Sequence, residues 1–222
     1  FSEVQLVGVE LIDGAGGPDV LTGSAGNDVM RGGSGQDTLD GGAGDDLFKV
    51  IGDEGTDTVA GGTGFDTIQG SAGDDVIGLR GLSGIEVIDA GDGYDVIRGS
   101  GNRNVLDFSE VQLVGVELID GAGGPDVLTG SAGNDAIRGG AGEDMIDGGA
   151  GFDTVYFDGN YADYTVSGGD GTFTVEAHAT QERADDLTNV EALRFADGIF
   201  EDGKFNLVGV TTASDQLVYD GA

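Results

Sequence analysis

The feature that most constrains the fold of this chain is a nine-residue repeat, G-G-x-G-x-D-x-U-x, in which U is a large apolar residue. Two successive copies occupy residues 32–40 and 41–49. Glycine has no Cβ and adopts left-handed backbone conformations without strain, so the first six positions predict a turn. The apolar residue with its two flanking residues predicts a three-residue strand that turns one side chain inward.

The sixth-position aspartates of this repeat recur along most of the chain, usually nine residues apart. They are Asp19, Asp28, Asp37, Asp46, Asp57, Asp66, Asp75, Asp95, Asp126, Asp135, Asp144 and Asp153. Two extra residues precede Asp57, and Asn104 occupies a position where another aspartate is expected. Nine residues cannot bury one apolar side chain alone, so two repeats form an 18-residue coil and the coils stack into two parallel sheets. The predicted fold is all-β, a parallel β-roll or β-helix solenoid of nonapeptide repeats.

Longer apolar segments interrupt the nine-residue rhythm. Residues 1–13 read as strand, and the segments 6–13, 82–89 and 113–120 predict strands longer than those of the repeats. Each segment contains a glutamate (Glu10, Glu86 and Glu117), which we expect to make a structural hydrogen bond, as we do for Glu191 in a similar setting.

The longest internal repeat is a duplication, because residues 1–28 are identical to residues 108–135. The offset of 107 residues is close to six coils. Six coils would contain twelve half-coils, but only about eleven can be counted between the two copies. The sequence therefore does not decide on which side of the stack the second copy lies.

The glycine pattern stops near Asp158, which predicts a different structure for the end of the chain. Alternating residues at 164–167 and 172–176 flank a Gly-rich turn and predict a β-hairpin. Aromatic residues gather in this part and are expected to close the open end of the stack. They are Phe157, Tyr161, Tyr164, Phe173, Phe195, Phe200 and Phe205. We therefore predict a roll over residues 1–157 and a C-terminal β-rich cap over residues 158–222.

Composition narrows the possible partners. The chain has 46 glycines and a formal net charge of −33, from 42 acidic and 9 basic residues. This charge excludes nucleic acid and argues against binding to an anionic membrane surface. We expect such a chain to stay open unless cations neutralise it. The sequence has no cysteine for a disulfide, and no apolar run long enough to predict a membrane span.

The chemistry of the turns favours Ca²⁺ as the neutralising cation. Glycine-rich turns direct backbone carbonyls toward one point, and each aspartate adds a carboxylate, so all ligands are oxygen atoms. Mg²⁺ demands tighter octahedral geometry, and a zinc site is disfavoured by the absence of Cys and the single His. The predicted ligands are the twelve aspartates named above, with the backbone carbonyls of Gly33, Gly35, Gly42, Gly44, Gly62, Gly64, Gly140, Gly142, Gly149 and Gly151.

Turns on the same side of the stack lie two repeats apart, so each ion is expected to be shared by a pair of turns. The predicted aspartate pairs are Asp19 with Asp37, Asp28 with Asp46, Asp57 with Asp75, Asp126 with Asp144, and Asp135 with Asp153.

These repeats resemble the RTX (hemolysin-type) calcium-binding repeats of bacterial proteins exported by type I secretion. The resemblance covers about residues 14–155 and is closest at 32–49 and 139–154. It implies a parallel β-roll that is disordered at low Ca²⁺ in the cytosol and folds outside the cell. Residues 158–205 are similar to the segment that often follows such repeats. The resemblance also implies the type I secretion apparatus as a partner, and a secreted or cell-surface location.

Three functions follow as hypotheses. The first is a Ca²⁺-binding module that supports export, folding and extracellular stability of a larger secreted protein. The second is an adhesin or surface-layer module that binds polysaccharide or cells, and the third is the non-catalytic C-terminal domain of a secreted hydrolase or lyase. We expect no enzymatic activity from this chain, because it has no H-E-x-x-H or G-x-S-x-G motif and only one histidine, His178.

Overall fold

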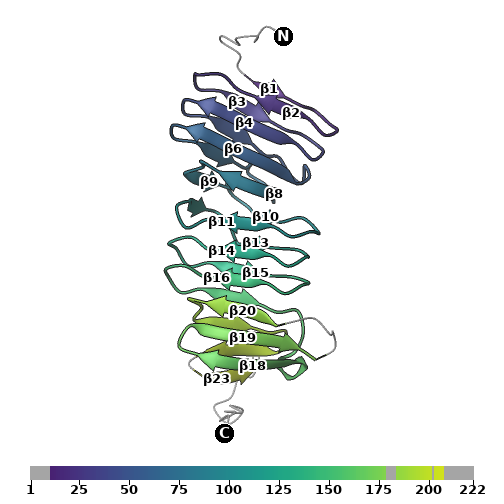
Figure 1. The fold of residues 1–222 in the computed structure, drawn as a ribbon, viewed down its shortest axis with the longest axis vertical. Helices are drawn as coiled ribbons and strands as arrows, with labels where there is room; N and C mark the ends of the chain where they lie inside the picture. Colours follow the sequence, from purple (N-terminus) through teal and green to yellow (C-terminus); the bar gives the residue numbers. More distant parts are fainter. Residues whose placement is uncertain (1–10, 179–183, 202, 208–222) are drawn as a thin grey trace.

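The computed structural model describes residues 11–178, 184–201 and 203–207. It is an elongated stack of short coils that run along the long axis of the molecule (Figure 1). Nearly all of its regular structure is β-strand, with one 3-10 helix at Tyr161–Asp163. The predicted all-β parallel solenoid is confirmed.

Three sheets build the stack, where two were predicted. A six-stranded sheet contains β1 (Ile12–Asp13), β3 (Val29–Arg31), β5 (Leu47–Lys49), β7 (Thr67–Gln69), β9 (Val87–Asp89) and β12 (Gln112–Val114). An 11-stranded sheet contains β2 (Val20–Thr22), β4 (Thr38–Ala43), β6 (Asp57–Thr63), β8 (Val76–Ser83), β10 (Val96–Arg98), β13 (Leu118–Asp120), β15 (Ala136–Arg138), β17 (Thr154–Tyr156), β21 (Ala192–Arg194), β22 (Gly198–Glu201) and β23 (Lys204–Leu207). A second six-stranded sheet contains β11 (Val105–Asp107), β14 (Val127–Thr129), β16 (Met145–Asp147), β20 (Asp185–Thr188), β19 (Thr172–Ala177) and β18 (Tyr164–Gly169).

The core is a narrow file of apolar side chains between these sheets, to which nearly every strand of the roll contributes its middle residue. Parallel pairing places each such residue beside its equivalent in the next coil, as Met30 lies beside Phe48 and Phe48 beside Ile68. All three side chains are fully buried. Burying a large aliphatic or aromatic side chain stabilises a fold by about 1.5–3 kcal/mol, so the file holds the coils together one residue at a time.

The regular stacking is broken at β8, which is longer than the repeat strands. Its first residues pair with β10, whereas its later residues pair with β6. The pairing with β6 contains a register shift, because Asp57 lies opposite Leu79 but Thr58 lies opposite Gly81. The predicted pair of Asp57 with Asp75 is therefore wrong. The Gly52 N–H, not that of Asp57, donates a close hydrogen bond to Asp75 Oδ1, and the Asp75 N–H in turn donates to Asp95 Oδ1 at 2.7 Å.

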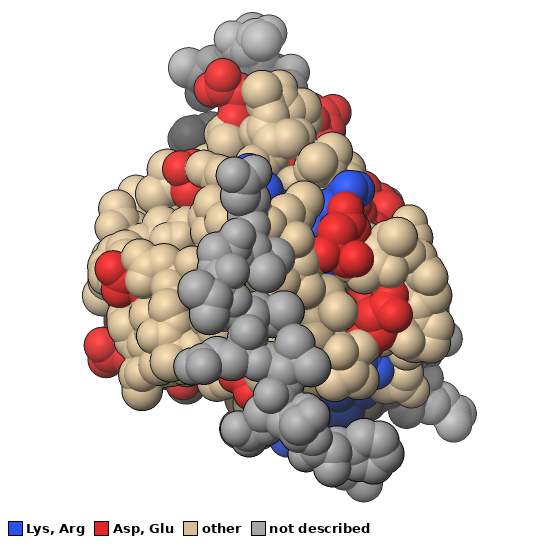
Figure 2. Space-filling model, turned by 90° about the horizontal axis from the view of Figure 1, so that it is seen from above, with Lys and Arg blue, Asp and Glu red and all other residues tan. Residues whose placement is uncertain are grey.

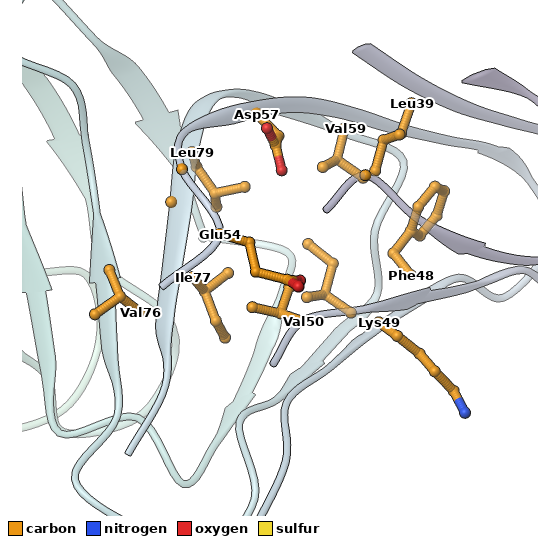
Figure 3. A pocket seen from close by; sticks show the side chains of 14 residues that line it. Leu39, Phe48, Lys49, Val50, Glu54, Asp57, Val59, Val76, Ile77 and Leu79 are labelled. Atoms are coloured by element: carbon orange, nitrogen blue, oxygen red, sulfur yellow. The ribbon is translucent and has the colours of Figure 1, made fainter. Parts of the chain in front are cut away.

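A small cavity of about 20 Å³ marks this junction between coils. Figure 3 shows Asp57 and Glu54 on facing sides of it, whereas Lys49 points away. Glu54 is buried and accepts a close hydrogen bond from the Arg31 guanidinium, so its charge is paired inside the fold.

The predicted long strands at 82–89 and 113–120 are each two short strands joined by a sharp corner, whereas residues 6–10 of the third, at 6–13, lie outside the described residues. A left-handed residue lies at each corner, Gly84 (φ +60°) and Gly115 (φ +66°), and Asn189 (φ +51°) holds the same place between β20 and β21. We call the segments 84–86, 115–117 and 189–191 the glutamate corners, because each ends in a glutamate. The carboxylates of Glu86, Glu117 and Glu191 accept the N–H groups of Asp66, Asp95 and Asp153 at 2.7, 2.6 and 2.8 Å, respectively. The structural role predicted for these glutamates is confirmed, and Glu10 lies outside the described residues.

The identical segments lie in different sheets. Ile12 belongs to the first six-stranded sheet, but its equivalent Ile119 belongs to the 11-stranded sheet. Likewise, Leu21 lies in the 11-stranded sheet and Leu128 in the second six-stranded sheet. The second copy therefore lies on a different side of the stack from the first.

The C-terminal part continues the 11-stranded sheet and the second six-stranded sheet in parallel and then reverses the strand direction. β16 pairs in parallel with β20 and β17 with β21, whereas the strands beyond them pair antiparallel. The predicted hairpin is confirmed as β18–β19, with Asp170 and Gly171 at positive φ in its turn. Figure 1 places these strands at the end of the stack opposite β1. No helix in the described part of the chain is long and apolar enough to span a membrane.

Candidate metal-binding turns

The turns between strands stack into five columns, which we call turn ladders. The first ladder contains the turns at 14–19, 32–37 and 52–57, the second those at 23–28, 41–46 and 61–66, and the third those at 70–75 and 90–95. The fourth contains those at 99–104, 121–126 and 139–144, and the fifth those at 130–135 and 148–153. Within each ladder, the N–H of the sixth residue donates to Oδ1 of the aspartate in the next coil at 2.6–2.9 Å. The predicted aspartate pairs are thus confirmed, except Asp57 with Asp75.

The second carboxylate oxygen of many of these aspartates has no hydrogen-bond partner among the described residues, although it is buried. These Oδ2 atoms belong to Asp19, Asp37, Asp46, Asp66, Asp95, Asp126 and Asp153. Burying a charged oxygen without a partner is costly, so native folds satisfy such atoms with a donor or a cation. These turns therefore offer buried carboxylate oxygen atoms as ligands for a cation.

The pKa values of several turn aspartates reflect the same cost of burial. Desolvation on burial raises the pKa of Asp57 and Asp153 to about 6 and that of Asp126 to about 7. Burial also raises the pKa of Asp46, Asp66 and Asp95, with neighbouring carboxylates contributing to the shift. Without a cation, each of these groups is held as a carboxylate only at a free-energy cost.

Backbone carbonyls converge on the same places as the carboxylates. The ten glycines predicted to supply carbonyls all have positive φ, as the sequence pattern requires. At Gly121, an added Cβ would lie 2.5 Å from Gly139 O and 2.7 Å from Asp126 Oδ2. The first glycine of the turn thus keeps open a space in which a carbonyl oxygen of one coil meets a carboxylate oxygen of its neighbour. Such an all-oxygen donor set fits Ca²⁺.

The ligands are spread along the backbone rather than gathered as side chains. No group of three or more His, Cys, Asp or Glu side chains in the described ranges is placed to hold a metal ion. A site in these turns therefore depends on one carboxylate per turn together with carbonyls. The donor set contains neither sulfur nor imidazole, so it does not suit Zn²⁺.

Sequence reasoning missed several residues that shape the ladders. Ala15 and Ala122 occupy the second position of their turns at positive φ (68° and 70°), where the repeat has glycine. Because both alanines occupy the glycine position of the nonapeptide, the sequence pattern could have indicated their positive φ. Asp185 in β20 accepts the N–H of Asp144 at 2.9 Å and so extends the fourth ladder. No repeat pattern surrounds Asp185, so the sequence offered no signal for it.

The open space at the first glycine leads to a direct test. Gly121→Ala is expected to destabilise the folded protein by about 2 kcal/mol and to weaken Ca²⁺ binding, because the new methyl group would overlap Gly139 O and Asp126 Oδ2. Urea unfolding with Ca²⁺ present would measure the first effect and a Ca²⁺ titration the second. Gly101→Ala, in the same ladder with no atom within 4 Å of its added Cβ, is the matched control. Equal stability and affinity in the two variants would contradict the expectation.

Comparison with known families bears on these turns directly. A family model described as the RTX calcium-binding nonapeptide repeat matches the chain in four copies, at residues 13–48, 51–78, 80–110 and 120–155. Together the copies cover more than half of the 222 residues, including all five ladders. No curated protein matches the chain significantly.

Proposed function

The chain belongs to the family of RTX calcium-binding nonapeptide repeats, and from this premise we propose that Ca²⁺ bound between its turns decides whether the roll folds. The observation that carries the proposal is the set of buried aspartate Oδ2 atoms that lack a hydrogen-bond partner. Because these oxygens lie beside backbone carbonyls, a divalent cation between two turns would neutralise the charge that folding buries.

The charge of the chain supports the same proposal. A net charge of −33 opposes compaction, and Figure 2 shows acidic side chains on several sides of the coil seen end-on. A ligand present at 100 times its Kd stabilises a folded protein by about 2.7 kcal/mol per site. Several such sites would together exceed the net stability of about 5–15 kcal/mol that is typical of folded proteins.

Ca²⁺-dependent folding suits a protein that leaves the cell before it folds. We propose that the chain is a module of a secreted bacterial protein, exported unfolded through a type I apparatus and folded where Ca²⁺ is abundant. The support for this step is the family, whose repeats are typical of secreted bacterial proteins. We further propose that the module is non-catalytic. Its single histidine, His178, lies exposed on the terminal hairpin and shares a hydrogen bond of 2.8 Å with Thr165.

Direct measurement of metal binding tests the proposed function. Isothermal titration of the chelator-treated protein with Ca²⁺ is expected to show several bound ions per chain. Mg²⁺ is expected to bind much more weakly at the same concentrations, because it demands a tighter octahedral shell and gives up its water reluctantly. Failure of the protein to bind Ca²⁺, or equal affinity for both metals, would contradict the proposal.

The raised pKa values predict how pH acts on the metal-free protein. The folded carboxyls of Asp57, Asp126 and Asp153 bind protons up to about pH 6–7, whereas unfolded aspartates have a pKa of about 3.9. Their contribution to the stability of the metal-free roll is therefore fully present below about pH 4 and is lost as the pH rises through about 6–7. Far-ultraviolet circular dichroism of the metal-free protein is expected to show more β structure at about pH 4.5 than at about pH 7.5, where the metal-free roll is expected to be unfolded.

The same protons compete with the metal, so Ca²⁺ affinity is expected to fall about tenfold between pH 7.5 and pH 5.5. A Ca²⁺ titration that gives the same midpoint at both pH values would show that these carboxylates do not bind the ion.

A further inference from the structure

The turns of the five ladders fall into two kinds that differ in their second residue, except the turn at 52–57, which has Asp53 at this position. In one kind, this residue has positive φ and is Gly or Ala. It is Ala15, Gly33, Gly42, Gly62, Gly91, Ala122, Gly140 or Gly149. In the other kind, this residue is a serine, which is not at positive φ. It is Ser24, Ser71, Ser100 or Ser131. The buried Oδ2 atoms that lack a hydrogen-bond partner all belong to turns of the first kind.

The serine turns satisfy their own aspartate. The N–H groups of Ser24 and Ser131 donate to Oδ2 of Asp28 and Asp135 at 2.6 and 2.7 Å. In the turn at 130–135, the Ser131 hydroxyl also lies 3.1 and 3.0 Å from the two carboxylate oxygens. The turn at 70–75 repeats this pattern with an N–H···O distance of 2.5 Å. A carboxylate that receives such donors does not require a cation to offset its burial.

One serine turn shows that the negative charge is dispensable. The turn at 99–104 has Asn104 where the other turns have aspartate, and Asn104 is buried. The Ser100 N–H donates to Asn104 Oδ1 at 3.0 Å, as the other serines do to their carboxylates. Asn104 also keeps its place in the fourth ladder, because its N–H donates to Asp126 Oδ1 at 2.6 Å. A neutral amide thus closes the turn in the same way as a carboxylate.

Three of the four serine turns also share a position in the stack. Each is the first described turn of its ladder: 23–28 in the second, 99–104 in the fourth and 130–135 in the fifth. The fourth, at 70–75, has a neighbour in the preceding coil, because the Gly52 N–H donates a close hydrogen bond to Asp75 Oδ1. A first turn has a ladder neighbour on only one side, so its sixth residue is not shared between two neighbouring turns. The first described turn of the first ladder, at 14–19, has Ala15 in the place of serine.

We infer that serine at the second position marks a metal-independent turn, which starts its ladder in three of the four cases, and whose sixth residue is a hydrogen-bond acceptor and not a Ca²⁺ ligand. This inference rests on the proposed function. It removes Asp28, Asp75 and Asp135 from the set of carboxylates that bind Ca²⁺, and it keeps the aspartates of the Gly and Ala turns. The serine turn still offers its backbone to the next coil, as Ser131 O does against Gly149.

A pair of substitutions in the fifth ladder tests the inference. Asp135→Asn is expected to leave the number of bound Ca²⁺ ions unchanged, because the amide oxygen accepts the Ser131 N–H and the amide nitrogen faces the Ser131 hydroxyl. Asp153→Asn, in the next turn of the same ladder, is expected to lose one ion. The ions would be counted by native mass spectrometry and by isothermal titration of the folded protein with Ca²⁺. Loss of an ion from Asp135→Asn, or an unchanged count in both variants, would overturn the inference.

A second pair of substitutions, in another ladder, tests the inference independently if a variant of the first pair does not fold. Asp28→Asn and Asp46→Asn occupy consecutive turns of the second ladder, and Asp28 belongs to a turn identical in sequence to that of Asp135. The same contrast is expected: no ion lost from Asp28→Asn and one lost from Asp46→Asn. The wild-type count separates the two hypotheses. A wild-type protein without bound Ca²⁺ contradicts the proposed function, whereas a wild-type protein that binds Ca²⁺ but shows no contrast contradicts only the serine-turn inference.

Discussion

Removal of Ca²⁺ with excess chelator is expected to unfold the β-roll at neutral pH. Without the ions, buried carboxylates would lie above one another in the five ladders, and those of Asp19, Asp37, Asp46, Asp66, Asp95, Asp126 and Asp153 each have an oxygen with no hydrogen-bond donor among the described residues. The apolar file contributes about one residue per strand, which is a thin core for a chain with 46 glycines to order. The loss of several ions, each contributing about 2.7 kcal/mol at 100 times its Kd, is therefore expected to exceed the stability of the fold.

Far-ultraviolet circular dichroism during a Ca²⁺ titration would measure this transition. We expect a cooperative gain of β signal as Ca²⁺ is added and its loss when chelator is added. Mg²⁺ at equal concentration provides the control for ionic strength and for general neutralisation of charge. A β signal that persists in excess chelator at neutral pH would show that the roll folds without the metal.

The second large effect is expected from Phe195→Ala in the C-terminal cap. The Phe195 ring is almost completely buried and packs against Phe157 and Tyr164, each with ring centroids 5.3 Å away, and against Tyr161 at 5.2 Å. Truncation of a buried phenylalanine costs about 3–5 kcal/mol, because it removes apolar contacts and leaves a cavity. Since the solenoid needs a closed end, we expect the loss to affect the roll as well as the cap.

Thermal unfolding in saturating Ca²⁺ would measure this cost, which corresponds to a fall of about 10 °C in the midpoint for a domain of this size. Phe152→Ala is the matched control, because the Phe152 side chain is half-exposed on a turn of the roll. We expect its effect to be within about 0.5 kcal/mol. Equal destabilisation by both substitutions would show that the aromatic cluster does not stabilise the end of the stack.

The sequence predicted those parts of the fold that depend on local chemistry. The nine-residue spacing placed inward residues such as Leu39 and Ile137 correctly, because alternation along a strand fixes which side chain faces the core. The positive φ of Gly42 and Gly140 followed from a pattern that only glycine satisfies without strain. The hairpin around Asp170 was predicted for the same reason.

Features that depend on contacts between distant coils could not be predicted in this way. The Arg31–Glu54 ion pair and the displacement of Asp75 from Asp57 arise where β8 runs on between two parts of the stack. The segment 113–120 looked like one strand because its residues favour β structure, yet Gly115 bends the chain there. In the candidate sites, the sequence identified the aspartates, but the donor that each carboxylate receives became visible only in three dimensions.

The placement of the two identical segments in different sheets has a consequence for folding kinetics. Identical strands compete for the same neighbours while the chain collapses, and an exchange of the two copies would attach a strand to the wrong sheet. The same sequence also meets unequal surroundings, since Leu11 is 45% exposed and its equivalent Leu118 only 9% exposed. If the stack assembled from the cap, one coil after another, the copy at 108–135 would pair first. The copy at 1–28 would then have only its native neighbours left to pair with. Growth of the stack in one direction would thus decide which of the two identical segments pairs with which strand.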